Sequence, residues 1–343
     1  MKTIKLSAIA LLLVLFCQTS FISAQNQSVE PFLGSWALTL DYESNSAGWC
    51  EIRLDEGYLD ADVLWRWGSV YGADFVFIQD DQLFMTSGSR LVRKKDKDGN
   101  PLKTHQYISW INARVKEDGS LAGTAFFPNQ DGIGVESVGF TGEKIPAQST
   151  RPDLSKVTYG KPEKLFNGKD LTGWELLEKG SVNGWKAVDG VLVNDPVQKE
   201  GEHVSYGNLR TTKTFKDFNI KVEVNVPKGS NSGIYMRGIY EVQVMDSYGE
   251  KLNPHNMGAL YSRITPSVAA EKPAGEWQAM DITLCKRHLT VILNGKKIID
   301  NEPVKGVTGG AMTSDEFNPG PIYLQGDHGK ISYRNIVLTP IVE

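Results

Sequence analysis

Hydrophobic and aromatic residues occur along the chain in short runs, which Gly, Asn and Asp separate. In the first half, β-branched and aromatic runs indicate strands over residues 36–40, 62–67, 75–78, 107–111 and 123–127. Asp98-Gly99 and Asp118-Gly119 are typical of hairpin turns. Helical periodicity over eleven or more residues is absent, so we predict an antiparallel β-barrel or sandwich over residues 25–147.

A second series of strand patterns follows a polar segment that contains proline at both ends. Residues 148–161 are therefore interpreted as a linker. Asn294-Gly295 indicates a type I′ hairpin turn. We expect an all-β second domain over residues 162–343, with strands at 218–226, 232–236, 240–245, 277–284, 289–293, 321–324 and 330–342.

The first 24 residues have the pattern of a signal peptide. Lys2 and Lys5 precede an apolar run that is too short to span a bilayer, and small residues end at Ala24. We predict cleavage after Ala24 and a periplasmic or secreted protein. Attachment of a lipid at Cys17 is the less favoured alternative, because Phe16 stands where a lipobox has a small residue.

Charge and metal-ligand spacing narrow the functional classes. The 343 residues include 37 Lys and Arg against 41 Asp and Glu, a net charge of −4, which argues against a nucleic-acid partner. The five His residues form neither His-x-His nor His-Glu-x-x-His, so we predict no preformed zinc site, and a metal site of scattered carboxylate and His ligands is the open alternative. Phosphate-loop and dinucleotide-binding motifs are absent, so we predict no cofactor. Cys50 and Cys285 are interpreted as two buried thiols rather than a disulfide.

Six motifs occur in order in the second half: 165–174, Trp185 ahead of 189–192, 231–238, 240–246, 275–278, and 324–329 ahead of 334–336. In order and spacing they resemble the 3-keto-disaccharide hydrolase family. This resemblance implies a concanavalin-like jelly-roll sandwich, similar to laminarinase-type glucanases, that cleaves sugars oxidised at C3. Gly326 is inserted relative to the family's usual pattern. Separately, Gly34-Ser35-Trp36 looks like the start of a lipocalin-like barrel.

Alternation along the predicted strand 240–245 suggests a binding face. Glu241 and Gln243 point to one side, and Val242 and Val244 point to the other. The polar side either lines a cleft or is a solvated edge. Asp246 follows at an odd interval and is read either as a catalytic residue that a bulge brings into line or as a turn cap.

Two further ionisable residues are candidates for the reaction. Arg237 could polarise a substrate carbonyl or enolate, or it could form a structural ion pair with Glu241 or Asp246. Asp327 or a main-chain carbonyl could orient the ring of His328.

The mechanism implied by the resemblance is removal of the C2 proton, elimination of the C1 substituent and addition of water. The predicted catalytic residues are Glu241, His328 and Asp246, with acid and base unassigned between the first two. The predicted binders of an oxidised glycoside or disaccharide are Arg237, Gln243, Gln325, Asp327, His255, Tyr261 and Trp185. The alternative function is a non-catalytic carbohydrate-binding sandwich.

Several aromatic residues and the first domain leave alternatives open. Trp185 and Tyr261 would either stack on a sugar ring or belong to the core. Trp65 and Trp67 share a face by alternation, and we favour plugging of the barrel over lining of a sugar site. The first domain would be a scaffold or a specificity module. No protein partner is predicted.

Overall fold

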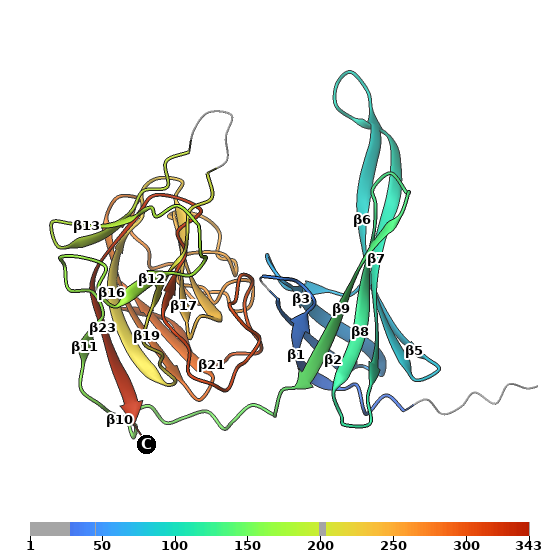
Figure 1. Ribbon diagram of the computed structural model, residues 1–343, viewed down its shortest axis with the longest axis horizontal. Coiled ribbons are helices and arrows are strands. Elements are labelled where there is room, and N and C mark those ends of the chain that lie inside the picture. Colours follow the sequence, from blue (N-terminus) through green and yellow to red (C-terminus); the bar gives the residue numbers. More distant parts are fainter. Residues whose placement is uncertain (1–27, 45, 199–203, 343) are drawn as a thin grey trace, which may run out of the picture.

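The computed structural model describes residues 28–44, 46–198 and 204–342. The predicted signal peptide and Cys17 lie outside these residues. The regular secondary structure of the described residues is β-strand throughout, so the all-β prediction is confirmed (Figure 1). None of the described elements is a helix long and apolar enough to cross a membrane.

One antiparallel sheet contains the first nine strands, in the order β4-β3-β2-β1-β9-β8-β7-β6-β5. It curls into a half-barrel in which β4 and β5 are the two edges. Consecutive strands pair with each other except β4 and β5, and β9 returns to lie beside β1, with Leu38 opposite Gly142. The strands are β1 (Gly34–Leu40), β2 (Ala47–Asp55), β3 (Tyr58–Trp65), β4 (Tyr71–Gly72), β5 (Phe75–Gln79), β6 (Gln82–Lys95), β7 (Pro101–Val115), β8 (Leu121–Pro128) and β9 (Val135–Lys144).

Side chains fill the inside of the half-barrel. Trp36, Leu38 and Phe140 belong to its buried core, and the indole N–H of Trp36 donates to the carbonyl of Phe32 at 2.8 Å. A cavity of about 10 Å³ lies beside Val63 on the inner face. The core around Trp36 is therefore closely packed.

The remaining strands form a jelly-roll sandwich of two sheets. One has the order β13-β14-β23-β16-β19-β20-β21, with β10 and β11 also paired to β23, and the other has the order β12-β15-β22-β17-β18. The strands are β10 (Thr158–Tyr159), β11 (Glu163–Lys164), β12 (Trp174–Leu176), β13 (Trp185–Val188), β14 (Val191–Asn194), β15 (Leu209–Thr211), β16 (Phe218–Asn225), β17 (Asn231–Met236), β18 (Tyr240–Met245), β19 (Trp277–Cys285), β20 (His288–Leu293), β21 (Lys296–Pro303), β22 (Tyr323–Leu324) and β23 (Ile331–Val342).

Local signals in the sequence account for several details. Asn294 and Gly295 have φ values of 49° and 81°, which a type I′ turn requires, and they connect β20 to β21 as predicted. Cys50 and Cys285 are free and buried in different sheets, so the interpretation as two thiols is confirmed. Burial raises the pKa of Cys50 to about 12, which keeps that thiol protonated.

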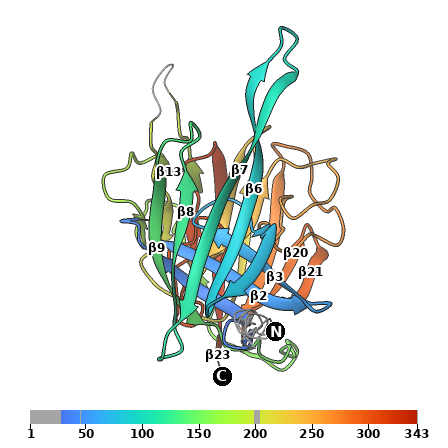
Figure 2. The ribbon, with the colours of Figure 1, turned by 90° about the vertical axis from the view of Figure 1, so that its right-hand side faces the viewer.

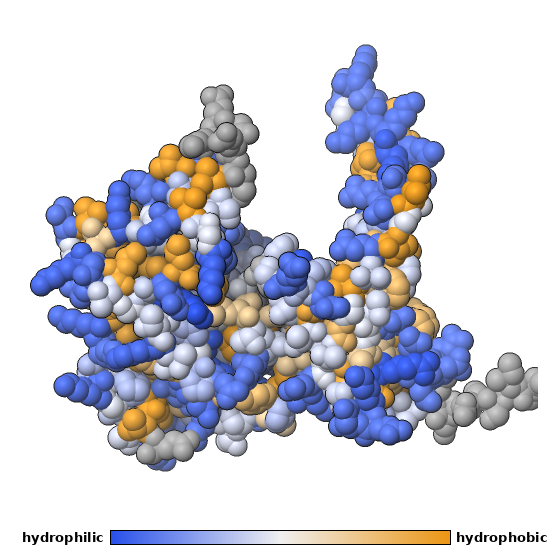
Figure 3. All heavy atoms as spheres, in the orientation of Figure 1, coloured by the Kyte–Doolittle hydropathy of each residue, from blue (hydrophilic) through white to orange (hydrophobic). Residues whose placement is uncertain are grey.

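The half-barrel packs directly against the sandwich (Figure 2). Trp49 of β2 is buried in the core that the sandwich strands form, and the guanidinium of Arg263 lies 4.3 Å from the centre of its ring. A Cβ atom at Gly306 would collide with the Trp49 indole. The contact around Trp49 is thus closely packed. The β6–β7 hairpin extends well beyond it, and the outer end of that hairpin is largely hydrophilic (Figure 3).

Candidate active site

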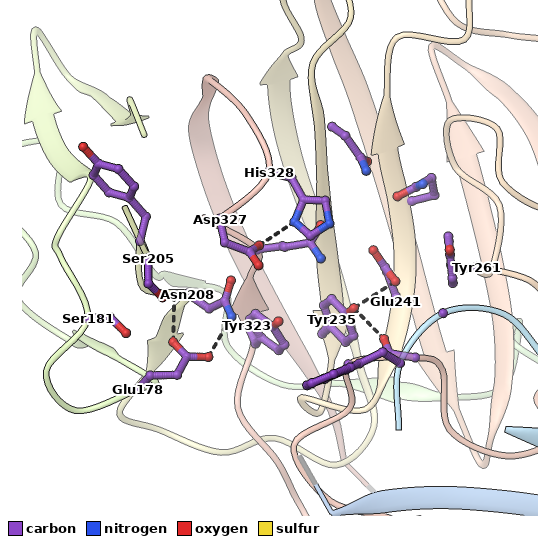
Figure 4. Close-up of a pocket in the computed structure, with 18 residues that line it drawn as sticks. Glu178, Ser181, Ser205, Asn208, Tyr235, Glu241, Tyr261, Tyr323, Asp327 and His328 are labelled. Carbon is purple, nitrogen blue, oxygen red and sulfur yellow. Dashed lines mark hydrogen bonds and ion pairs between the residues drawn. The ribbon is translucent and has the colours of Figure 1, made fainter. Parts of the chain in front are cut away.

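A cleft of about 470 Å³ lies on the outer face of the five-stranded sheet (Figure 4). Strands β17, β18 and β22 form its floor, and loops from both bodies form its walls. Its lining residues are Trp67, Gly68, Glu178, Ser181, Ser205, Tyr206, Asn208, Asn231, Tyr235, Glu241, Gln243, Tyr261, Gly309, Gly310, Tyr323, Gln325, Asp327 and His328. Six of the ten residues predicted for the site, including Tyr261, are therefore together in one cleft.

The predicted alternation along β18 is present in the structure. Glu241 and Gln243 line the cleft, whereas Val242 and Val244 are buried in the core between the sheets. Both polar residues are nearly fully buried in spite of facing the cleft. This strand is hydrogen-bonded to β17, and a Cβ atom at Gly233 of β17 would collide with the Glu241 carboxyl group. The absence of a side chain at Gly233 therefore leaves the space that the Glu241 carboxyl group occupies.

Tyr235 and Glu241 are directly opposite each other in the β17–β18 ladder. The Tyr235 hydroxyl oxygen is 2.9 Å from Glu241 Oε2 and 2.7 Å from the main-chain carbonyl of Gly309. The hydroxyl has one proton, and a carbonyl can only accept. If Tyr235 donates to Gly309, the second contact needs a proton on Glu241, which then donates to the phenol oxygen.

Burial points to the same protonation state for Glu241. Desolvation raises the pKa of this carboxyl to about 8, against the opposing effects of the Tyr235 hydrogen bond and the nearby His328 charge. At neutral pH, Glu241 is then a carboxylic acid with a proton to give. The stacked ring of Tyr323, 4.1 Å from that of Tyr235 between centres, holds the phenol in place.

His328 lies on the loop after β22 and forms a pair with its neighbour. Its Nδ1 atom is 2.6 Å from Asp327 Oδ1, so the predicted orientation of the ring by Asp327 is present in the structure. The hydrogen bond to Asp327 raises the pKa of His328, and partial burial opposes it. With Nδ1 bonded to a carboxylate, the ring has Nε2 as its remaining basic nitrogen.

The inserted Gly326 fits a close backbone approach. A Cβ atom there would lie 2.6 Å from the indole nitrogen of Trp185 and would also collide with the carbonyl of Gly207. The amide of Gly326 donates to Asn208 Oδ1 at 2.8 Å, and its carbonyl accepts from Asn194 at 2.8 Å. The insertion is thus fixed on both sides, and both Asp327 and His328 line the cleft beyond it.

The end of the cleft nearest Glu178 is polar and was not predicted. Glu178 accepts hydrogen bonds from the main-chain and side-chain N–H groups of Asn208, at 3.0 and 2.8 Å. Asn231 Oδ1 is buried and has no partner among the described residues. Glu178 and Asn208 lie in irregular segments without periodicity, so only the folded chain brings them here. Tyr235 could have been found, because it alternates with Gly233 on a predicted strand.

Two predicted binders occupy other positions for reasons of local geometry. Arg237, at φ 57°, lies in the β17–β18 turn, where the strand alternation has ended, and its guanidinium donates to the carbonyl of Asn318. It pairs with neither Glu241 nor Asp246. Trp185 is 3% exposed, and its indole N–H donates to the carbonyl of Gly207, so it is a core residue that does not line the cleft.

The other two exceptions are in loops. Asp246 follows the last residue of β18 and accepts from the amide of Gly229 at 3.0 Å, as expected of a turn cap. His255 contacts the hydroxyl of Ser69 at 2.8 Å and packs edge-on against the Tyr261 ring. Neither residue lines the cleft.

Trp67 lines the cleft although the preferred interpretation of the sequence placed it inside the barrel. Strand β3 ends at Trp65, and Arg66 adopts φ 65°, which breaks the alternation that put both indoles on one face. Trp65 contacts Phe127 and Phe140 at the barrel core. Trp67 is instead 58% exposed and lines the cleft.

Within the described ranges, no three His, Cys, Asp or Glu side chains are grouped so that they could hold a metal ion.

Sequence comparison assigns the second half to a known family. A family profile described as the 3-keto-alpha-glucoside-1,2-lyase-like domain matches residues 161–339. The chain belongs to this family. The resemblance inferred from the six motifs is therefore confirmed, and the matched residues contain every part of the cleft except Trp67 and Gly68.

The chain is also similar to individual proteins. A 3-keto-disaccharide hydrolase from Bacteroides thetaiotaomicron is 27% identical over 164 residues, which cover 40% of this chain and 57% of that protein. A candidate glycosyl hydrolase from Parabacteroides distasonis is 30% identical, with a TM-score of 0.43 over 56% of this chain and 94% of that chain. A laminarinase from Flavobacterium sp. UMI-01 is 15% identical, with a TM-score of 0.36 over 54% of this chain and all of that one.

Proposed function

We propose that this protein is a glycoside hydrolase that cleaves 3-keto-glycosides by elimination and addition of water. The observation that carries the proposal is that the buried carboxyl group of Glu241, whose pKa desolvation raises, and an Asp-paired imidazole line the same cleft. Family membership supplies the substrate class, and the relative named a 3-keto-disaccharide hydrolase supports it.

The first step assigns the base. The C3 carbonyl makes the C2 proton acidic, and His328 Nε2 removes it to leave an enolate. Asp327 keeps Nδ1 protonated and stabilises the imidazolium that forms. The amide group of Gln243, whose nitrogen has only the Met245 sulfur at 3.7 Å as a described partner, is available to donate to the enolate oxygen.

The second step assigns the acid. The enolate electrons expel the C1 oxygen, which takes the proton of Glu241, so the C1–O bond breaks and a C1–C2 double bond forms. Water then adds at C1 while a proton returns to C2, and the product is a free 3-keto sugar. This route needs no pair of carboxylates at glycosidase spacing, because no oxocarbenium ion forms.

The test compares an oxidised substrate with its parent. Purified protein is incubated with a 3-keto-glucoside and with the same glucoside bearing a hydroxyl at C3, and the released aglycone is measured. We expect release from the 3-keto compound alone, since only its C2 proton is acidic. Binding of both sugars without release from either would instead support the non-catalytic carbohydrate-binding function. Export to the periplasm or medium, from the predicted signal peptide, is part of the proposal and is tested by fractionation of cells.

A further inference from the structure

We infer that the half-barrel supplies a binding subsite for the leaving group, with Trp67 as the platform on which a ring of that group stacks. This inference rests on the proposed function. The shared chemistry of the ligand is a flat, partly apolar ring face, which a second pyranose and an aromatic aglycone both offer. Trp67 is thus a specificity-determining residue that lies outside the residues matched by the family profile.

The first support is position. Trp67 and Gly68 line the same cleft as Glu241, although they belong to the half-barrel. They share their wall of the cleft with Gly309 and Gly310, and the Gly309 carbonyl is the acceptor beside Tyr235. In the proposed reaction Glu241 protonates the departing oxygen, so the leaving group lies on the Glu241 side, beside this wall.

The second support is that the segment carrying Trp67 is fixed to the sandwich. The amide of Gly310 donates to the carbonyl of Arg66 at 3.1 Å, and the amide of Val70 donates to the Ser262 hydroxyl at 2.7 Å. A Cβ atom at Gly309 would collide with the backbone of Gly68. These contacts hold residues 66–70 at a set position over the cleft, as a binding platform requires.

The third support is that the Trp67 indole is exposed to the cleft and is held by a neighbouring side chain. Trp67 is 58% exposed and lines the cleft that contains Glu241, whereas none of the other exposed Phe, Trp and Tyr residues among the described ones lines it. The guanidinium of Arg66 lies 4.1 Å from the indole centre and 3.6 Å from the centre of the Tyr42 ring. This cation–π contact sets the orientation of an otherwise loosely held side chain.

The test measures kcat/KM on three 3-keto-glucosides that differ in the leaving group: methanol, phenol and a second glucose. Trp67→Ala should lower the preference for a ring over methanol by about 2- to 12-fold, the value of an aromatic stacking contact. Trp67→Phe should restore most of that preference. If the loss is confined to the glucose substrate, the subsite is one for sugars, and if it is confined to the phenol substrate, for aromatic aglycones. Tyr248→Ala, at an exposed aromatic residue that does not line the cleft, is the control.

The outcomes separate this inference from the proposed function. If the wild-type protein cleaves none of the three substrates, the proposed function fails. If the wild type cleaves them and Trp67→Ala changes all three equally or not at all, the proposed function stands and the subsite is wrong. Thermal unfolding of each variant checks that the exposed indole has been removed without loss of the fold.

Discussion

The two bodies of this protein use the hollow side of an antiparallel sheet in opposite ways. In the half-barrel, Trp36, Leu38 and Phe140 fill the inside, and the cavity beside Val63 has a volume of about 10 Å³. On the five-stranded sheet of the sandwich, Glu241 and Gln243 occupy the outer face and leave about 470 Å³. Curvature alone therefore does not make a binding site. The site forms where polar residues alternate along a strand whose other face is already buried in a core.

The largest expected effect is on catalysis. His328→Ala and Glu241→Gln should each lower kcat on a 3-keto-glycoside by about 10²–10⁴-fold, the usual contribution of a positioned base or acid. His105→Ala and Glu136→Gln change exposed residues of the half-barrel and are the matched controls. Steady-state kinetics decide the matter, and a loss below tenfold in either site variant would remove that residue from the reaction.

Substitutions in the packed interior of the half-barrel should lower the free energy of unfolding and not the rate of catalysis. Leu38→Ala removes a fully buried side chain and should lower the free energy of unfolding by about 2–5 kcal/mol. Leu54→Ala, at a half-exposed position, is the control. Urea denaturation measures both. An equal, small effect of the two substitutions would mean that the half-barrel core is less well packed than described.

A smaller effect on stability and kcat is expected at Gly233, where the absence of a side chain leaves space for the Glu241 carboxyl group. Gly233→Ala places a Cβ atom against the Glu241 carboxyl, and this overpacking should cost about 1–3 kcal/mol and lower kcat as well. Gly139→Ala is the control. A Cβ atom at Gly139 would lie 3.8 Å from its nearest neighbour, so this substitution should change neither stability nor kcat. Retention of full activity by the Gly233 variant would show that the position of Glu241 is not fixed by β17.

The protonation state of Glu241 also predicts that stability depends on pH. Its pKa is about 8 in the folded protein against 4.5 ordinarily, so between these values the folded state binds the extra proton. Stability from this group is therefore lost as pH rises from 5 to 8. Glu241→Gln should be increasingly stabilised relative to wild type over that range in urea denaturation. A constant difference between the two proteins would mean that Glu241 is ionised at neutral pH.

Strand periodicity and turn chemistry could be predicted from the sequence because they are local. The Asn294-Gly295 turn and the alternation of Glu241 with Val242 both follow from backbone geometry within a few residues. Arg237 and Trp67 lie just beyond strand ends, where a positive φ, at Arg237 itself and at Arg66, ends the alternation on which their placement had relied. The hydrophobic periodicity of the sequence does not indicate where such a positive φ occurs.

Contacts between distant segments could not be predicted for a different reason. Glu178 is brought to the cleft through Asn208, and Trp67 through contacts between the half-barrel and the sandwich. The sequence left Trp185 between stacking on a sugar and belonging to the core, and a main-chain partner, the carbonyl of Gly207, places its indole in the core. Whether an aromatic side chain is exposed depends on such partners, which the order of residues along the chain does not give.

The most direct test of the central claim is the fate of the C2 hydrogen. The wild-type protein is allowed to cleave a 3-keto-glycoside in D₂O, and the early product is analysed by NMR, with product incubated alone as the control for spontaneous exchange. Elimination and addition of water by His328 and Glu241 predicts deuterium at C2 of the released sugar. Product that keeps its original C2 hydrogen would contradict this mechanism and indicate direct hydrolysis at C1.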